Sequence, residues 1–453
     1  MNDKKTLSIC IPTLNRANLL RTSLKIIEKE CLPYLDQIEI VVADNASTDG
    51  TEDIVLESGL PIKYGKQGRT VGFAKNLAYA TSTLASGEYV WIVGDDDSLL
   101  PGSVGRILAS IARAPGIDYH YLNFGWIDVK WRERLFHHDQ FEIPDSIFRN
   151  LQCNLREYRQ LARLEDLAWL PGKNPSALFS GIFCFVTRRV FFEDARKWLN
   201  PSDSLDGSSI LLDDCFPHAL ATIPRVCGKP VAYVGEPCVL QGINGWEWGD
   251  YAVKNMIFGT HQLFTWMEEN GFAPDAMSEL WKSYRKMAGM LFARMLHKPE
   301  KNKGMDIVLE ESIPSSAKKE DFWLSFNAES RFMYEIEHDA SNILKWTAQT
   351  LQNNPLARIG LWGATGRGTL FMDNFPRLDR LCWIGDRETT FHGTRVEGTE
   401  LTVLAPSSIE HADLDALVIC TRREHIEEVV AAASSHLKPG TTLISADGIT
   451  LSR

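Results

Sequence analysis

Three consecutive carboxylates, Asp95, Asp96 and Asp97, follow the apolar residues 89–93 and a glycine. Side chains of an extended segment alternate between its two faces, so Asp95 and Asp97 can converge while Asp96 points away. Two carboxylates held close together repel each other unless a positive charge lies between them. A divalent cation supplies that charge, and Mg²⁺ bound by carboxylates commonly shares its coordination with substrate phosphates. The alternative is an acidic turn in which Asp97 or Ser98 helps to start a helix over residues 101–112.

Polar residues also follow the other predicted strands of this region. Residues 6–11 have the pattern of a strand and enter a polar turn at residues 12–16. A second strand at residues 38–43 ends in the polar run 44–50, and residues 71–76 open a helix. Strands that alternate with helices and end in polar loops indicate a mostly parallel α/β sheet. Ligands of such sheets bind beyond the carboxyl ends of the strands, where all of these polar clusters fall.

These segments, in this order and spacing, resemble the family 2 glycosyltransferases. Residues 11–16 resemble the opening strand and loop of the family, and residues 44–50 match its D-x-S-x-D-G segment, which in relatives contacts the base and ribose. Residues 70–76 resemble the N-x-G-x-x-x-A-R-N segment, with Thr70 in place of the first Asn and Lys75 in place of the Arg. The acidic triplet occupies the place of the D-x-D motif. The resemblance is specific over roughly the first hundred residues and looser to about residue 250.

The resemblance implies the fold and the donor site. We expect an α/β chain with an N-terminal GT-A domain, which is a Rossmann-like nucleotide-sugar-binding fold, a helical connector and a small C-terminal Rossmann-like α/β domain. The residues expected to bind the donor are Pro12, Thr13, Asn15, Arg16, Asp44, Asn45, Ser47, Lys75, Asn76, Asp95 and Asp96.

A nucleoside diphosphate leaving group carries negative charge that a metal ion can orient and neutralise. We assign Asp97 as a ligand of Mn²⁺ or Mg²⁺, and Asp95 as shared between this metal and the ribose. Arg16 and Lys75 are expected to add positive charge near the phosphates. Arg69 fits a solvated surface side chain better.

An inverting transfer also needs a general base that removes the proton of the acceptor hydroxyl. Family members place an Asp or Glu after a strand-and-turn unit beyond the D-x-D motif. Here the predicted strand and turn at residues 180–189 are followed by Asp213 and Asp214. Asp214 is the first candidate for the base and Asp213 the second. Both acids could equally mark a helix N-terminus, where they complement the helix dipole, and the two roles are compatible. His218 is expected to be structural and not a metal ligand.

Length and composition fit a multidomain enzyme. The chain has 453 residues, of which 44% are hydrophobic and 24% charged, so two or three domains are expected. The chain has no run of eighteen apolar residues and no charged-then-apolar leader, so we expect neither a membrane span nor a signal peptide. Its nine cysteines are scattered, which fits a cytoplasmic protein with reduced thiols. The net charge of −11 argues against broad nucleic-acid binding. It is compatible with local basic patches that dock peripherally at the inner face of a membrane.

Three parts are expected along the chain. Residues 1–250 form the glycosyltransferase-like domain, and residues 251–355 form a helical connector that is also a candidate homo-oligomer interface. Residues 356–453 show a strand, the Gly-rich turn at 363–368 and a second strand ending in Asp386. These are elements of a dinucleotide-binding turn, although the glycines read G-x-x-G-x-G and not G-x-G-x-x-G. We expect a Rossmann-like fold without redox chemistry there.

The sequence therefore predicts an inverting, metal-dependent glycosyltransferase. It would move a sugar from a nucleotide sugar, UDP-linked by family resemblance, to a hydroxyl of a bacterial cell-envelope glycan or lipid-linked oligosaccharide. One alternative is a nucleotidyltransferase acting on sugar phosphates, which also places carboxylates and a divalent ion at a sheet edge. The N-terminal loop, however, lacks the Gly-rich basic turn that cradles a triphosphate. The other is an NAD- or nucleotide-binding protein centred on the C-terminal domain.

Overall fold

The computed structural model describes residues 5–129, 132, 151–170, 179, 181–205, 208–243, 251–297, 303, 305–364, 367–387, 392–393, 395–396 and 399–451. The chain divides into two compact units, Met1–Asn327 and Ala328–Arg453. The division into domains at residues 250 and 355 stays a prediction.

The first unit is built on a mixed sheet. Along it the strand order is β3-β2-β1-β4-β8-β6-β9-β5, with β7 paired to β9. Strands β1 to β4 pair in parallel, whereas β8 runs antiparallel to both β4 and β6. The sheet is thus parallel over β1 to β4, as predicted, and becomes mixed from β5 onward, because β5 pairs antiparallel with β9. The strands are β1 (Leu7–Thr13), β2 (Ile38–Asp44), β3 (Ile62–Lys66), β4 (Tyr89–Ile92), β5 (Ser98–Leu99), β6 (Tyr119–Asp128), β7 (Arg159–Leu161), β8 (Phe185–Arg188) and β9 (Val231–Ile243).

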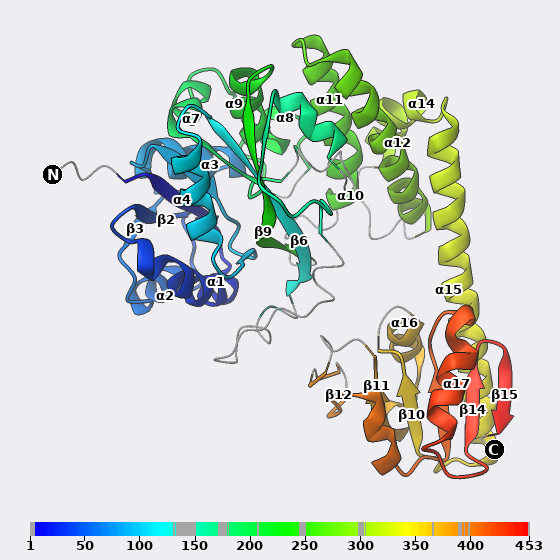
Figure 1. The fold of residues 1–453 in the computed structure, drawn as a ribbon. Coiled ribbons are helices and arrows are strands. Elements are labelled where there is room, and N and C mark those ends of the chain that lie inside the picture. The colour runs from blue at the N-terminus through cyan, green and yellow to red at the C-terminus, as the bar shows by residue number, and fades with distance from the viewer. Residues whose placement is uncertain are drawn as a thin grey trace. The chain divides into compact units, whose positions relative to one another are not determined.

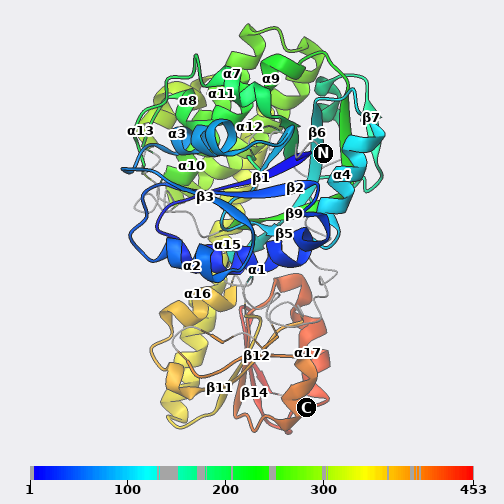
Figure 2. The same ribbon diagram turned by 90° about the vertical axis from the view of Figure 1, so that its left-hand side faces the viewer.

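Helices cover both faces of the parallel part of the sheet. In Figure 2, α1 (Ala17–Cys31) and α2 (Thr51–Glu57) lie on one side of β1 to β3, and α3 (Phe73–Ala78) lies on the other. All seven residues of β1 are buried, as expected for a parallel strand with helices on both faces. Among the described residues before 230, the other α-helices are α4 (Ser103–Arg113), α7 (Arg189–Ala195), α8 (Leu212–Cys215) and α9 (Pro217–Val226).

A helical region completes the first unit (Figure 1). Its buried side chains, among them Phe264, Leu280 and Tyr284, belong to the same hydrophobic core as the sheet. The predicted helical character of this region is confirmed. Its helices are α10 (Ala252–Lys254), α11 (Thr260–Glu269), α12 (Pro274–His297), α13 (Met305–Ile307) and α14 (Ile313–Ser316), followed by α15 (Glu320–Asn353), which continues into the second unit.

The second unit contains a smaller sheet with the strand order β12-β11-β10-β13-β14-β15. Five of these strands run parallel and β15 runs antiparallel to β14. The predicted fold class, an α/β domain with a second and smaller α/β unit, is confirmed. The elements are β10 (Ile359–Trp362), α16 (Arg367–Asn374), β11 (Leu381–Gly385), β12 (Val403–Leu404), β13 (Ala416–Ile419), α17 (Ile426–Ser434), β14 (Thr442–Ser445) and β15 (Gly448–Leu451).

Among the helices that the structure describes, none combines the length and the apolar character needed to cross a membrane.

Candidate active site

The acidic triplet lies at the carboxyl edge of the parallel strands. Thr13, the last residue of β1, is in register with Asp44, the last residue of β2. On the other side of β1, Cys10 is in register with Ile92, the last residue of β4. The triplet follows β4 after two residues, so the loops after all three strands meet at one edge, as the sequence predicted.

Two residues from the end of β1 hold the first carboxylates of the triplet. The Thr13 hydroxyl donates a 2.7 Å hydrogen bond to Asp95 Oδ2. Nη1 of Arg16 lies 2.5 Å from Asp95 Oδ1, and Nη2 lies 2.8 Å from Asp96 Oδ2. The guanidinium group therefore bridges two carboxylates instead of pairing with both oxygens of one. Four of the predicted donor-site residues, Thr13, Arg16, Asp95 and Asp96, are thus brought together.

Backbone amides hold the third carboxylate. The N–H of Gly94 donates a 2.8 Å hydrogen bond to Asp97 Oδ2, and the N–H of Gly242, at the end of β9, donates one of 3.1 Å to Asp97 Oδ1. A side chain at position 242 would not fit, because a Cβ there would lie 2.2 Å from the carbonyl oxygen of Asp96. The close approach of β9 to the triplet therefore depends on a glycine.

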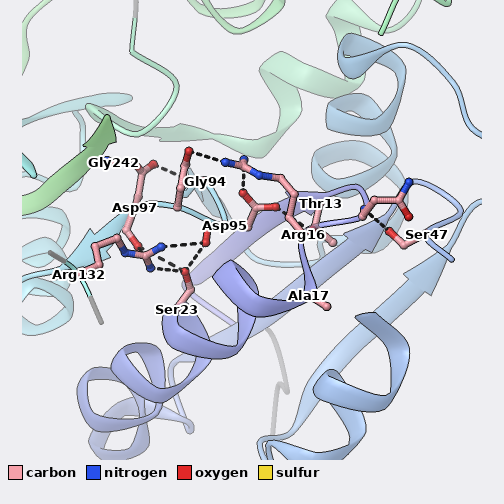
Figure 3. Close-up of polar contacts among 12 residues, drawn as sticks. Thr13, Arg16, Ala17, Ser23, Ser47, Gly94, Asp95, Asp97, Arg132 and Gly242 are labelled. Atoms are coloured by element: carbon pink, nitrogen blue, oxygen red, sulfur yellow. Dashed lines mark hydrogen bonds and ion pairs between the residues drawn. The ribbon is translucent and has the colours of Figure 1, made fainter. Parts of the chain in front are cut away.

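Arg132 is a second cation of the site, and the sequence analysis missed it. Its side chain is fully buried. Nη1 and Nη2 donate hydrogen bonds to the carbonyl oxygens of Asp95 and Asp97, at 3.2 and 2.8 Å, and Nη2 and Nε bond the hydroxyls of Ser23 and Ser98. Figure 3 shows Asp95 and Asp97 lying between the guanidinium groups of Arg16 and Arg132. Arg132 lies 35 residues beyond Asp97 in sequence and outside the motifs described above, so its contact with the triplet depends on the fold.

The triplet is more negative than its surroundings can balance. Burial raises the pKa of the carboxyls of Asp95 and Asp97 well above the usual range of aspartate; Arg16 lowers that of Asp95 in part, and the charge of Asp96 raises both. When all three carboxyls are ionised, their charge exceeds that of the guanidinium groups of Arg16 and Arg132 by one.

The donor chemistry of the triplet fits a hard divalent cation. Within the described residues, no group of three or more His, Cys, Asp and Glu side chains is already arranged around a metal position. Asp95 and Asp97 nevertheless offer carboxylate oxygens, the ligands that Mg²⁺ and Mn²⁺ prefer, in a buried cluster with excess negative charge. These two residues are the ones that would hold the predicted metal.

The loops after β1 and β2 are joined to each other. Asn15, with φ of +50°, donates its N–H to Ser47 Oγ and accepts the N–H of Thr48 at Oδ1, both at 2.8 Å. The N–H of Ala17 bonds Asp49 Oδ2, also at 2.8 Å. Arg16 therefore lies in a backbone segment that is anchored on both sides.

Several other predicted donor-site residues lie at the same edge but bond to the protein itself. Asp44 is fully buried and accepts hydrogen bonds from the Ser47 N–H and the Tyr64 hydroxyl. Asn45 makes two hydrogen bonds to the backbone of Val71, and Asn76 Nδ2 donates to the carbonyl oxygen of Ala43. These contacts set the loop positions. Pro12 is buried within β1.

Lys75 has a partner that the sequence analysis did not anticipate. Its Nζ lies 2.9 Å from Asp203 Oδ1, and Arg69, which is exposed, lies 3.3 Å from Asp203 Oδ2. The N–H of Gly72 also donates to Asp203 Oδ1. The segment predicted to approach the phosphates is therefore bonded to the loop before α8.

The two candidate bases anchor that same loop. Asp214 Oδ1 accepts the N–H of Ser202 at 2.8 Å, and Oδ2 accepts the hydroxyls of Ser202 and Ser209 at 2.6 and 2.5 Å. Asp213 Oδ2 accepts the N–H of Asn200. Both acids lie in the first turn of α8, which agrees with the alternative interpretation as a helix start. His218 is buried in α9 near the rings of Phe185 and Phe216.

Residues 8–164 match the family model described as glycosyl transferase family 2. They contain β1 to β4 and the acidic triplet. Over these residues the chain is similar to the family 2 glycosyltransferases.

Curated relatives share this region. The chain is 40% identical over 243 residues to abequosyltransferase RfbV of Salmonella typhimurium, covering 52% of this chain and 66% of that protein. It is 33% identical over 110 residues to GalNAc(5)-diNAcBac-PP-undecaprenol beta-1,3-glucosyltransferase of Campylobacter jejuni, covering 22% of this chain and 33% of that protein. The chain thus spans less than two thirds of the length of each relative.

Solved structures of glycosyltransferases are more distant. S. aureus TarS 1–349 in complex with UDP-GlcNAc superimposes with a TM-score of 0.41 at 15% identity, covering 64% of this chain and 73% of that one. Mannosyltransferase PcManGT from Pyrobaculum calidifontis, in complex with GDP-Man and Mn²⁺, gives a TM-score of 0.40 at 17% identity, covering 73% and 86%.

Proposed function

We propose that the protein is an inverting, metal-dependent glycosyltransferase that acts on a bacterial cell-envelope glycan or a lipid-linked oligosaccharide. The observation that carries the proposal is the buried acidic triplet, held by Thr13 and Arg16 at the carboxyl edge of the family 2 domain. The names of the two curated relatives support a sugar transfer, and one of them names an undecaprenol-linked acceptor.

In this proposal the donor diphosphate binds beside the triplet. Asp97 and Asp95 would hold Mn²⁺ or Mg²⁺, which supplies neutralisation of the charge that develops on the departing diphosphate. Arg16 adds a guanidinium group suited to phosphate oxygens. The hydrogen bond from the Asn15 N–H to Ser47 Oγ anchors the backbone next to it. UDP is the proposed nucleotide.

Asp214 is the proposed base for the acceptor. Its carboxylate already accepts two hydroxyl groups, those of Ser202 and Ser209, so an acceptor hydroxyl can replace one of them. Taking the acceptor proton as the hydroxyl attacks the anomeric carbon makes the acceptor a better nucleophile. Asp213, whose Oδ2 holds the backbone of Asn200, is the second candidate.

The second unit is proposed to be a Rossmann-like module without redox chemistry. Counted along the chain, its strands stand in the order third, second, first, fourth, fifth and sixth, which is the dinucleotide-binding order. Asp386, which directly follows β11, accepts the N–H of Ala364 from the Gly-rich turn at 2.7 Å. Asp386 occupies the position that binds a ribose in dinucleotide-binding domains, and here one of its carboxylate oxygens is bonded to the protein itself. Thr365 and Gly366 of the turn lie outside the described residues.

The test is thermal stability with UDP, GDP, CDP and NAD, each with and without Mn²⁺. A ligand that binds only the native state raises the melting temperature. We expect a Mn²⁺-dependent rise with one nucleoside diphosphate, and that result would also identify the base. A rise with NAD alone would overturn the proposal and move the functional centre to the second unit.

A further inference from the structure

The two cations at the acidic triplet differ in how firmly they are held. Arg132 is fully buried and bonded to two backbone carbonyl oxygens and two hydroxyls, so its position is part of the core. The side chain of Arg16 is 17% exposed, and its guanidinium group contacts the carboxylates of Asp95 and Asp96. Arg16 is therefore the cation that can be exchanged.

The motion that matters here is that of the Arg16 side chain. The residues on either side are fixed, since the Asn15 N–H bonds Ser47 and the Ala17 N–H bonds Asp49. Rotation about the side-chain bonds can carry the guanidinium group away from Asp95 without moving the loop. Such rotamer changes are fast compared with ligand exchange.

Arg16 and a divalent cation compete for the same atom. Nη1 lies 2.5 Å from Asp95 Oδ1, and Mg²⁺ needs its oxygen ligands at about 2.0–2.1 Å. A dication at Asp95 would also lie close to the positive guanidinium group and be repelled by it. In the structure described here, Arg16 thus supplies the positive charge that the metal would supply.

A nucleoside diphosphate removes this conflict. Its oxygens offer the guanidinium group a partner with the geometry that arginine prefers. Once Arg16 turns to the diphosphate, Asp95 is released to the metal, and the extra negative charge of the ligand offsets the added positive charge.

We propose that Arg16 is an exchangeable counter-ion that keeps the Asp95–Asp97 site closed to divalent cations until a nucleoside diphosphate binds. The proposal rests on the proposed function for the identity of the anion. Its consequence is that the metal and the nucleotide each raise the affinity for the other, because such coupling is reciprocal.

The experiment measures Mn²⁺ binding by electron paramagnetic resonance for the wild type, Arg16→Ala, Arg16→Gln, Arg16→Lys and the control Arg21→Ala. Arg21 is an exposed arginine of α1 that pairs with Glu57, away from the triplet. Each protein is titrated alone and with saturating UDP, GDP or CDP. Circular dichroism establishes that each variant is folded, and Arg16→Gln replaces Arg16→Ala if the latter does not fold.

For the wild type we expect a nucleoside diphosphate to tighten Mn²⁺ binding by about tenfold or more, within the usual range of coupling between sites. The neutral variants of Arg16 should bind Mn²⁺ alone about tenfold more tightly than the wild type and lose most of the coupling. Arg16→Lys and Arg21→Ala should behave more like the wild type.

Equal affinity of Arg16→Ala, Arg16→Gln and the wild type for Mn²⁺ alone would overturn the proposal, as would unchanged coupling in the neutral variants. If none of the three diphosphates binds to any protein, the proposed function fails. The comparison of Mn²⁺ affinities without nucleotide still decides whether Arg16 excludes the metal, so the two failures are distinguishable.

Discussion

Nη2 of Arg132 lies 2.8 Å from the carbonyl oxygen of Asp97, so a buried guanidinium group binds the main chain of the acidic segment and not its carboxylates. The buried guanidinium group of Arg132, bonded to the backbone of Asp95 and Asp97, offsets part of the repulsion among the three carboxylates. The metal and the donor would then bind to a segment whose backbone is already in place. Preorganisation of this kind spares the enzyme from ordering the site during catalysis.

Replacing Arg132 with methionine should destabilise the protein. The change leaves two carbonyl oxygens without their donor and three buried carboxylates with one cation fewer, and removing one side of a buried charge cluster costs about 3–5 kcal/mol. Urea unfolding of Arg132→Met measures this loss. The control Arg21→Met, which removes an exposed pair with Glu57, should cost at most about 1 kcal/mol. Equal stability of the two variants would contradict the assigned role of Arg132.

Asp97→Ala should abolish metal-dependent nucleotide binding. The side chain is the predicted metal ligand, and its two oxygens are held by the amides of Gly94 and Gly242. Calorimetry with UDP, GDP and CDP in the presence of Mn²⁺ should show a loss of about a hundredfold or more in affinity, as expected when a direct metal ligand is removed. Glu57→Gln, an exposed change on α2, provides the comparison. Retained Mn²⁺-dependent affinity in Asp97→Ala would place the metal elsewhere.

Asp214→Asn should leave nucleotide binding intact and remove turnover. An amide can accept a hydrogen bond but cannot take up the proton of the acceptor hydroxyl, and general-base catalysis contributes about 10²–10⁴-fold. Ser209→Ala separates this effect from loop anchoring, because it removes one hydrogen bond to Asp214 and keeps the carboxylate. Single-turnover transfer to an acceptor glycan is the measurement. If Asp214→Asn retains wild-type activity while Asp213→Asn loses it, the base is Asp213.

Stability should fall between pH 7 and pH 5 in part because of His120. This histidine is buried, with its ring edge-on to Tyr89 and Nδ1 2.8 Å from the hydroxyl of Ser110. Burial lowers its pKa from 6.5 to about 4. Over this interval the unfolded chain takes up a proton that the native protein does not, so the free energy of unfolding decreases as the pH falls. The contribution is about 2 kcal/mol between pH 7 and pH 5.

Urea unfolding at both pH values, compared between the wild type and His120→Gln, isolates this contribution. The variant should lose less stability on acidification than the wild type. Identical losses would show that His120 is protonated in the native protein or that its environment is more polar than the structure indicates.

The parallel half of the site could be predicted because the information is local. A strand pattern and a polar loop locate Thr13, Asp44 and Asp95 one by one, and parallel pairing then places their strand ends at the same edge. The predicted meeting of Thr13, Arg16 and the triplet follows from this rule. The same rule predicts nothing about the partners of these side chains.

The residues that the sequence did not identify reach the site through long-range packing. Arg132 has no motif around it, and its role depends on the path of the chain after β6. Asp203 pairs with Lys75 across 128 residues, so the motif position of Lys75 did not disclose that its charge is already met. The sequence around an arginine or aspartate does not show which distant residue it will pair with in the folded protein.

Asp339 of α15 determines where the second unit can be separated from the first. Its buried carboxylate pairs with Arg367, the first residue of α16, and with Arg423, the first residue of a short helical turn after β13. The nearby Ile343 belongs to the hydrophobic cluster that contains Phe371. A protease cut or gene truncation at residue 355 would remove Asp339, which pairs with two arginines of this unit, and Ile343, which belongs to its hydrophobic core. Dissection of the protein into two parts should therefore be made at the boundary between residues 327 and 328, inside α15 and not after it.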